Sequence, residues 1–261
     1  AISNALNLLD MLALVVPTAN DGRLNRAALD AAFAQDKLSG DGLSNVVALI
    51  ATAGTTNAGI VDNLADASAV ARKHGWWFHV DGAYGGAGML DPSKRHLFEG
   101  IENCDSLVMD PHKWWFAPFD SAALIYRDPR LAQAVHTQDA SYLDVIHTDE
   151  SNVYNPSDLA YHLTRRARGM ALWFSLAVNG LNAYRDAVAA GNALAHYAAE
   201  RIKQSPNLEL ILEPDLSVVL FRRKGWSASD YDRWADALLN QQVAFVTSST
   251  WLGETIGRLV F

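Results

Sequence analysis

The chain has 261 residues, 50% of them hydrophobic, which is enough for one large globular domain or for a domain and part of a second. The formal net charge of −8 excludes a strongly basic surface, so we expect no nucleic-acid partner and no cationic membrane-binding face. No hydrophobic run approaches the roughly 20 residues that a membrane-spanning helix needs. The single cysteine, Cys104, cannot form an internal disulfide, and we expect a cytoplasmic protein with a small-molecule partner.

The first half of the chain alternates predicted strands and helices. A short strand is expected at residues 14–16, and a helix begins at Asn25, which can act as its N-cap, with Leu24 and Leu29 in the positions of a hydrophobic staple. Continuous apolar runs at 46–51, 77–80 and 107–109 predict strands; residues 64–74 predict a helix closed by Gly75, and 121–126 a further strand. Strands that are apolar on both faces indicate a mainly parallel sheet between helices, the α/β class.

The second half has a different pattern. Residues 136–156 form a long polar loop, and 159–202 predict helix, broken near Gly180 and Gly191. Alternating leucines at 208–212 and 216–220 predict an antiparallel hairpin, which is followed by a helix at 229–240 and strands at 244–246 and 257–261. We therefore expect a large α/β domain over residues 1–170 and a smaller, incomplete α+β domain over 171–261.

Polar residues follow three of the predicted strands directly. Thr56 lies in the small, hydroxyl-bearing segment after the first of them, Asp81 and Ala83 follow the next, and His112 and Lys113 follow the third. Ligands of open α/β sheets bind beyond the carboxyl ends of the strands, so these side chains are expected to converge. A lysine between a histidine and two tryptophans is poorly placed for ordinary solvation.

This combination suits the chemistry of pyridoxal 5′-phosphate. A lysine amine can hold the aldehyde as a Schiff base, and a carboxylate, here Asp81, can keep the pyridine nitrogen protonated so that the ring accepts electrons. His79 lies two positions before Asp81 on the same face of the strand, where it either orients Asp81 or is a core histidine. A metal site made of His79, Asp81 and His112 is a weaker alternative, and we expect no metal.

Three segments resemble, in order and spacing, the central motifs of the group II pyridoxal-phosphate-dependent decarboxylases, which include the aromatic amino acid decarboxylases. They are residues 51–56 (ATAGTT), 78–86 (FHVDGAYGG) and 110–114 (DPHKW). Similarity extends over the whole chain and is strongest from about residue 46 to 175. The resemblance implies a fold type I transferase-like large domain with its N-terminal part missing, a partial small domain, pyridoxal 5′-phosphate as cofactor, an L-amino acid substrate and a homodimer whose active sites use both subunits.

The resemblance also implies roles for individual residues. Lys113 matches the lysine that forms the Schiff base, and Asp81 matches the partner of the pyridinium nitrogen. Thr56 and Ala83 match positions that contact the cofactor ring, and His112 matches a position beside the phosphate and the reacting centre. Thr164 matches a position that reaches the phosphate of the other subunit.

The polar loop gains a role in the same way. Residues 139–143 (DASYL) resemble the mobile loop of the family, and Tyr142 matches its catalytic tyrosine, which returns a proton to the α-carbon. Tyrosine at this position favours simple decarboxylation to an amine and carbon dioxide. An aldehyde synthase, an aminotransferase and an inactive fragment remain as alternatives.

Two positions and the chain ends depart from the family pattern. Asp110 stands where some relatives have an asparagine beside the phosphate, and because a carboxylate there would repel the phosphate, its direct contact stays open. Asp62 also falls in a family position, but it could instead cap the helix at 64–74. The histidine that stacks on the ring and the phosphate-gripping loop are expected upstream of residue 1, so we expect the chain to be a piece of a longer polypeptide.

Overall fold

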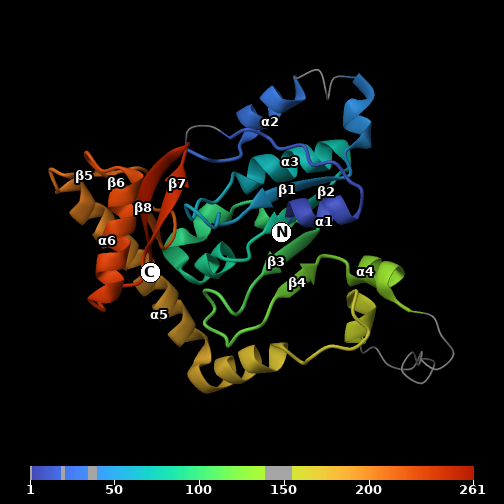
Figure 1. The fold of residues 1–261 in the computed structure, drawn as a ribbon. Coiled ribbons are helices and arrows are strands. Elements are labelled where there is room, and N and C mark those ends of the chain that lie inside the picture. The colour runs from blue at the N-terminus through green and yellow to red at the C-terminus, as the bar shows by residue number, and fades with distance from the viewer. Residues whose placement is uncertain (1, 19–20, 35–39, 139–154) are drawn as a thin grey trace.

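The chain contains two four-stranded sheets (Figure 1). The structure is a computed structural model and describes residues 2–18, 21–34, 40–138 and 155–261. The first sheet consists of β1 (Ala48–Thr52), β2 (Trp77–Asp81), β3 (Ser106–Met109) and β4 (Ala123–Tyr126), in that order. Strands β1, β2 and β3 are parallel, and β4 pairs with β3 in the antiparallel sense. The mainly parallel sheet expected from the apolar runs is confirmed, whereas the strand expected at 14–16 is wrong, since those residues have no regular structure.

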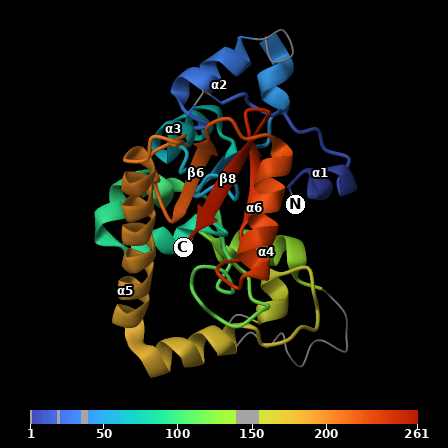
Figure 2. The ribbon, with the colours of Figure 1, turned by 60° about the vertical axis from the view of Figure 1, so that its left-hand side comes forward.

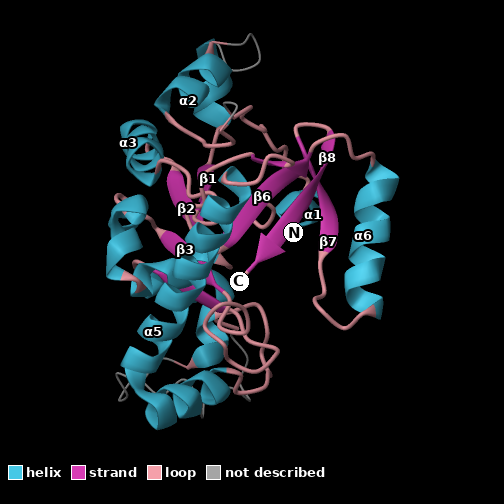
Figure 3. Ribbon diagram, turned by 90° about the vertical axis from the view of Figure 1, so that its left-hand side faces the viewer, coloured by secondary structure: helices cyan, strands magenta, loops and turns pink. Residues whose placement is uncertain are grey.

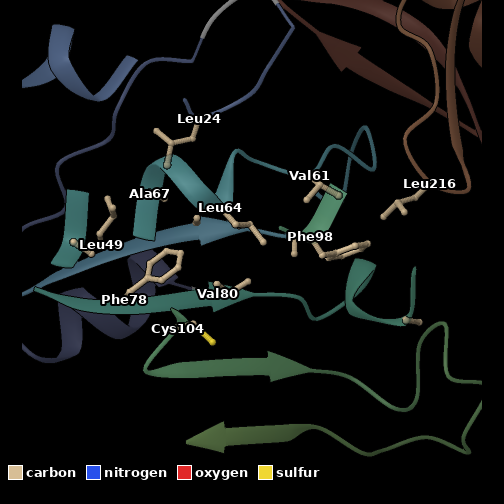
Figure 4. Close-up of a cluster of buried hydrophobic side chains, with 14 of the residues drawn as sticks. Leu24, Leu49, Val61, Leu64, Ala67, Phe78, Val80, Phe98, Cys104 and Leu216 are labelled. Atoms are coloured by element: carbon tan, nitrogen blue, oxygen red, sulfur yellow. The ribbon is translucent and has the colours of Figure 1, made fainter. Parts of the chain in front are cut away.

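The core of the first sheet lies on the face covered by α3 (Leu64–His74) (Figure 4). Leu49, Phe78 and Val80 point to that face from β1 and β2, and Leu64 from α3 packs against the same cluster. The helix α2 (Arg26–Phe33) adds Leu29. His79 and Asp81 alternate with the buried residues of β2 and are half-buried on the other face, as the two-residue period of a strand requires.

Side-chain caps define where these two helices begin. The Oδ1 atom of Asn25 accepts a hydrogen bond from the backbone N–H of Ala28 at 2.9 Å, which confirms the predicted N-cap of α2. The cap of α3 is Asn63, whose Oδ1 accepts from Asp66 N at 2.9 Å, so a cap at Asp62 is wrong. Asp62 is instead buried, and its carboxylate accepts from Leu24 N at 2.8 Å and from Thr52 N at 2.7 Å. Because the carboxylate already binds two amides outside the helix, the following residue takes over the cap.

Short helices connect the larger elements. They are α1 (Ile2–Leu8), η1 (Gly40–Asn45), η2 (Gly85–Leu90), η3 (Pro92–Phe98), η4 (Ile101–Asn103), α4 (Pro129–His136) and η6 (Pro156–Leu159). None of the helices in the described ranges combines the length and the hydropathy needed to cross a bilayer.

The long helix α5 (Gly169–Lys203) bends, as Figure 2 shows, and joins the two sheets. The bend is at Gly180, with φ 73° and ψ 159°, which confirms the predicted break there. The break expected at Gly191 is wrong: Gly191 is helical, and a Cβ on it would lie 3.5 Å from Trp114 Nε1. The helix also begins ten residues later than the predicted 159, because residues 156–159 form η6 instead.

The second sheet has the order β5 (Leu208–Leu210), β6 (Val218–Arg223), β8 (Glu254–Val260) and β7 (Thr247–Trp251), with antiparallel pairing throughout. The predicted hairpin, formed by β5 and β6, is confirmed, and so is the helix at 229–240, which is α6 (Ala228–Asn240) and lies beside β7 (Figure 3). The strand expected at 244–246 is wrong, because the strand that pairs with β8 begins at Thr247.

The two faces of the second sheet pack against different parts of the chain. Val219 and Phe221 of β6 pack with Ala195 of α5 and Trp234 of α6. On the opposite face, Val218, Leu220 and Ile256 pack with Ala58 and Ile60, which follow β1 of the first sheet. The second sheet is therefore held directly against the loops at the carboxyl edge of the first.

Candidate functional site

The register of the parallel strands brings the three predicted segments to one edge of the first sheet. Thr52 is paired with Asp81, and Asp81 with Val108. Beyond the strands, Gly82 N donates to Val108 O at 3.0 Å and Asp110 N donates to Ala83 O at 3.1 Å. The segments that carry Asp81, Ala83, Asp110 and Lys113 therefore leave the sheet side by side, as the sequence predicts.

Lys113 is tied to its own turn. Its Nζ lies 2.8 Å from Asp110 Oδ2, and its backbone N donates to Asp110 O at 2.9 Å. The Lys113 side chain is 41% exposed, so the expectation that its neighbours keep it from solvent is wrong, whereas the Asp110 side chain is only 14% exposed. In this structure the Asp110 carboxylate therefore faces the lysine amine.

Asp81 keeps one carboxylate oxygen available. Its Oδ1 accepts from Ala83 N at 3.1 Å, and no hydrogen bond from the described part of the chain reaches Oδ2. A half-buried carboxylate that is fixed through one oxygen can accept a hydrogen bond from a protonated ring nitrogen through its other oxygen. This is the arrangement expected for the partner of a pyridinium.

His79 does not orient Asp81 through a hydrogen bond. Its Nδ1 lies 2.7 Å from Ser106 Oγ, which also accepts from Trp77 Nε1 at 2.8 Å. Burial lowers the pKa of His79, and the nearby Asp81 carboxylate partly opposes this effect.

His112 is held by the segment before β4. Ser121 N donates to His112 Nδ1 at 3.0 Å, Ser121 O contacts the same nitrogen, and the Phe119 ring meets the imidazole edge-on at 5.0 Å. Within the described ranges no hydrogen bond occupies Nε2. The imidazole is thus fixed in orientation and keeps one nitrogen for a ligand.

Behind Lys113, two stacked rings connect the first sheet to the second. Trp114 is buried, and its ring stacks on that of Tyr84 at 5.1 Å with an interplanar angle of 20°. The Tyr84 hydroxyl lies 2.7 Å from Ser217 Oγ and accepts from Ser217 N at 3.2 Å. Burial raises the pKa of Tyr84, with the Ser217 hydrogen bonds opposing it. Sequence analysis missed the contact between Tyr84 and Ser217 because these residues are 133 positions apart.

Two glycines let the loops after β1 and β2 touch through their backbones. A Cβ placed on Gly85 would lie 2.2 Å from Ala53 O and 2.7 Å from Gly54 Cα. Only residues without a Cβ allow this approach. The glycines therefore fix the distance between the segment that carries Thr56 and the segment that carries Ala83.

The remaining predicted site residues are placed differently. Thr56 is exposed in the turn that follows β1. Thr164 is also exposed, and no hydrogen bond within the described residues joins it to the Lys113 turn. Tyr142 lies outside the described residues. Nor does the described part of the chain gather His79, Asp81 and His112, or any other set of three such ligands, into a group that could hold a metal ion.

Comparison with known proteins decides the family. Residues 2–224 match the model of the pyridoxal-dependent decarboxylase conserved domain. The chain belongs to this family. It is 35% identical over 210 residues to the aromatic-L-amino-acid decarboxylase of Drosophila lebanonensis, covering 80% of this chain and 51% of that protein. It is 31% identical over 233 residues to the L-2,4-diaminobutyrate decarboxylase of Acinetobacter baumannii, covering 88% of this chain and 44% of that protein.

The fold agrees with solved structures of the family. The structure of Oryza sativa TDC with PLP and tryptamine superposes with a TM-score of 0.87 at 25% identity, covering 99% of this chain and 55% of that one. The expected fold type I architecture is thereby confirmed. The chain spans about half the length of the curated relatives it matches.

The cofactor of the family is pyridoxal 5′-phosphate, and the donor set of this edge fits it. Lys113 supplies an amine, Asp81 a carboxylate oxygen without a partner among the described residues, and His112 a free imidazole nitrogen. These are the groups needed by an aldehyde, a ring nitrogen and an anionic substituent, respectively. The Asp110 carboxylate, 2.8 Å from the amine, would repel the phosphate if the phosphate approached it directly.

Proposed function

We propose that this chain carries the lysine half of the active site of a pyridoxal-phosphate-dependent enzyme that decarboxylates an L-amino acid to the amine and carbon dioxide. The observation that carries the proposal is the strand register. It aligns Thr52, Asp81 and Val108 in neighbouring strands and so delivers the three motif segments to one edge. The relatives named above support the reaction class, and an aromatic or a diamino acid substrate is consistent with their names.

When bound, pyridoxal 5′-phosphate supplies an aldehyde that amines capture and a ring that accepts electrons from a substrate's α-carbon. Lys113 holds the cofactor covalently through Nζ. Asp81, fixed through Oδ1 by Ala83 N, holds a proton at the ring nitrogen through Oδ2. His112, fixed through Nδ1, presents Nε2 to the phosphate side and the reacting carbon.

Five further residues complete the proposal. Thr56 and Ala83 contact the ring from the loops after β1 and β2, and Asp110 sits beside the phosphate with its carboxylate turned to Lys113. Thr164 serves the phosphate of a second subunit. Tyr142 returns a proton to the α-carbon after carbon dioxide leaves, and it lies outside the described residues.

Reduction with borohydride tests the covalent role of Lys113. Pyridoxal 5′-phosphate added to the chain should produce a visible absorption band, and reduction should fix the label on the peptide that contains Lys113. The Lys113→Ala variant should lose both signals, whereas Lys73→Ala, which removes an exposed lysine on α3, should keep them. A folded chain that shows no band would support the inactive fragment.

Product analysis distinguishes the reactions. Carbon dioxide and primary amine in equal amounts are expected from the holoenzyme with a suitable amino acid. Aldehyde with ammonia and peroxide would instead identify an aldehyde synthase, and pyridoxamine phosphate would identify an aminotransferase.

We also propose that residues 1–170 form the cofactor-binding domain and 171–261 the incomplete small domain, with α5 as the connection. The separate antiparallel sheet of the second region supports this division. A homodimer is proposed for the whole protein, since Trp173, Phe174 and Val178 on the first arm of α5 are 58%, 55% and 80% exposed. The cytoplasm is the proposed location, because a chain with a single cysteine has no internal disulfide that would need an oxidising compartment.

A further inference from the structure

The turn after β1 is a closed structure that presents Thr56 at its tip. Gly54 N and Thr55 N both donate to Ile60 O, at 3.0 and 2.8 Å, and Gly59 N donates to Thr55 O at 2.8 Å. Thr56 itself is exposed. These internal bonds close the base of the turn but leave the carbonyls of Thr56 and Asn57 at the tip to be satisfied from elsewhere.

A single arginine of the second sheet binds both tip carbonyls. Arg258 Nε donates to Asn57 O at 2.9 Å, and the second terminal nitrogen of its guanidinium donates to Thr56 O at 2.7 Å. Arg258 stands two residues after Ile256 on β8, so it shares the face that packs on the turn. The contact spans 202 positions of the sequence.

Among the residues that the structure describes, no carboxylate pairs with the charge on Arg258. By contrast, Arg23, which is also partly buried, forms an ion pair with Asp215. Burial lowers the pKa of the Arg258 guanidinium, so placing this cation here has a cost that its hydrogen bonds must offset. An arginine that donates to two carbonyls of one turn, and to no acid, acts on the shape of that turn.

The neighbouring strand β7 holds the same tip through Asn57. Asn57 Nδ2 donates to Thr250 O at 2.8 Å, and Ser249 Oγ donates to Asn57 Oδ1. Below the tip, Gly59 lies against Val218, whose Cβ would be 3.0 Å from a Cβ added to the glycine. Strands β6, β7 and β8 thus each contact a turn that belongs to the first sheet.

We infer that Arg258 is a positioning residue for the cofactor site: by binding the carbonyls of Thr56 and Asn57, it fixes the turn 54–60 in the conformation that places Thr56 beside pyridoxal 5′-phosphate. The inference rests on the proposed function. It makes the last strand of the second sheet a part of the cofactor site, although Arg258 itself touches only the backbone of the turn.

The test compares Arg258→Met with Arg258→Lys and with the control Arg222→Met. Arg222 lies on β6 of the same sheet but binds Glu209 and Glu254 at the surface, away from the turn. Two quantities are measured: the dissociation constant for pyridoxal 5′-phosphate by absorbance titration, and hydrogen exchange of the amides of residues 54–60 in the cofactor-free chain.

Arg258→Met removes two charge-assisted hydrogen bonds, and we expect a dissociation constant about tenfold higher or more, together with faster exchange of the turn. Arg258→Lys keeps the charge but cannot span both carbonyls, so its dissociation constant and exchange rates should lie between those of the unaltered chain and of Arg258→Met. This variant also provides the test if Arg258→Met does not fold. Arg222→Met should match the unaltered chain in both measurements.

Two results are decisive against Arg258. Binding by Arg258→Met within twofold of the unaltered chain, or unchanged exchange of residues 54–60, would overturn the inference while leaving the proposed function intact. Failure of the unaltered chain itself to bind pyridoxal 5′-phosphate would instead refute the proposed function, and the inference with it.

Discussion

Gly85→Ala tests whether the loops after β1 and β2 must meet backbone to backbone. The new Cβ would lie 2.2 Å from Ala53 O, 2.7 Å from Gly54 Cα and 2.8 Å from a Leu216 methyl carbon. Only the leucine can rotate away, so the loops must separate by most of an ångström. Gly85 does not have a positive φ, and the penalty is therefore one of space and not of backbone conformation.

We expect Gly85→Ala to lower the free energy of unfolding by about 3 kcal/mol, at the upper end of the cost of overpacking a core, because two of the three obstructing atoms are backbone. Urea unfolding followed by circular dichroism measures this loss. The control is Gly169→Ala at the start of α5, where an added Cβ meets nothing within 4 Å and should leave the chain unchanged or up to about 1 kcal/mol more stable. A loss below about 1 kcal/mol for Gly85→Ala would show that the loops can move apart easily and would refute the close approach as a constraint.

Two further predictions concern polar side chains beside the first sheet. Asn63→Ala removes only a helix cap and should lower the free energy of unfolding by about 1 kcal/mol. Asp62→Ala leaves the amides of Leu24 and Thr52 without acceptors and should lower it by about 2 to 4 kcal/mol. Equal losses of the two variants in urea unfolding would contradict the assignment of the cap. Because burial holds the pKa of His79 below its ordinary value of 6.5, the unfolded chain takes up the proton first, so stability should fall as the pH drops from 7.5 to 5.5. His79→Gln should reduce this fall, and an identical fall in both proteins would show that His79 does not contribute to it.

The strands of the first sheet were predictable because burial selects continuous apolar runs, and β1, β2 and β3 lie within two residues of those runs. The same criterion failed at β7. Residues 244–246 are apolar, yet Phe245 is 79% exposed, while the true strand is the polar Thr247–Trp251. That strand is specified by backbone pairing with β8 across the turn at Leu252 and Gly253, both at positive φ, and composition does not reveal such pairing.

The placement of the candidate site residues was predictable to the same extent. Asp81, His112 and Lys113 follow directly from the ends of strands, so a sequence pattern locates them. Their partners do not: His79 binds Ser106 because the register of β2 on β3 places them opposite each other, and Asp110 faces Lys113 through a local turn. Long-range partners such as Ser217 and Arg258 depend on how the second sheet packs, for which the sequence has no local signal.

The two faces of the second sheet explain why it matters to the site. The Val219 face, with α5 and α6, is an ordinary hydrophobic interface, whereas the Val218 face packs on Ala58 and Ile60. Because neighbouring residues of one strand serve the two faces, a change in the helical packing of β6 moves the residues that hold the turn after β1. The contacts of β6, β7 and β8 with Gly59, Asn57 and Thr56 therefore couple the stability of the second sheet to the geometry of the turn after β1.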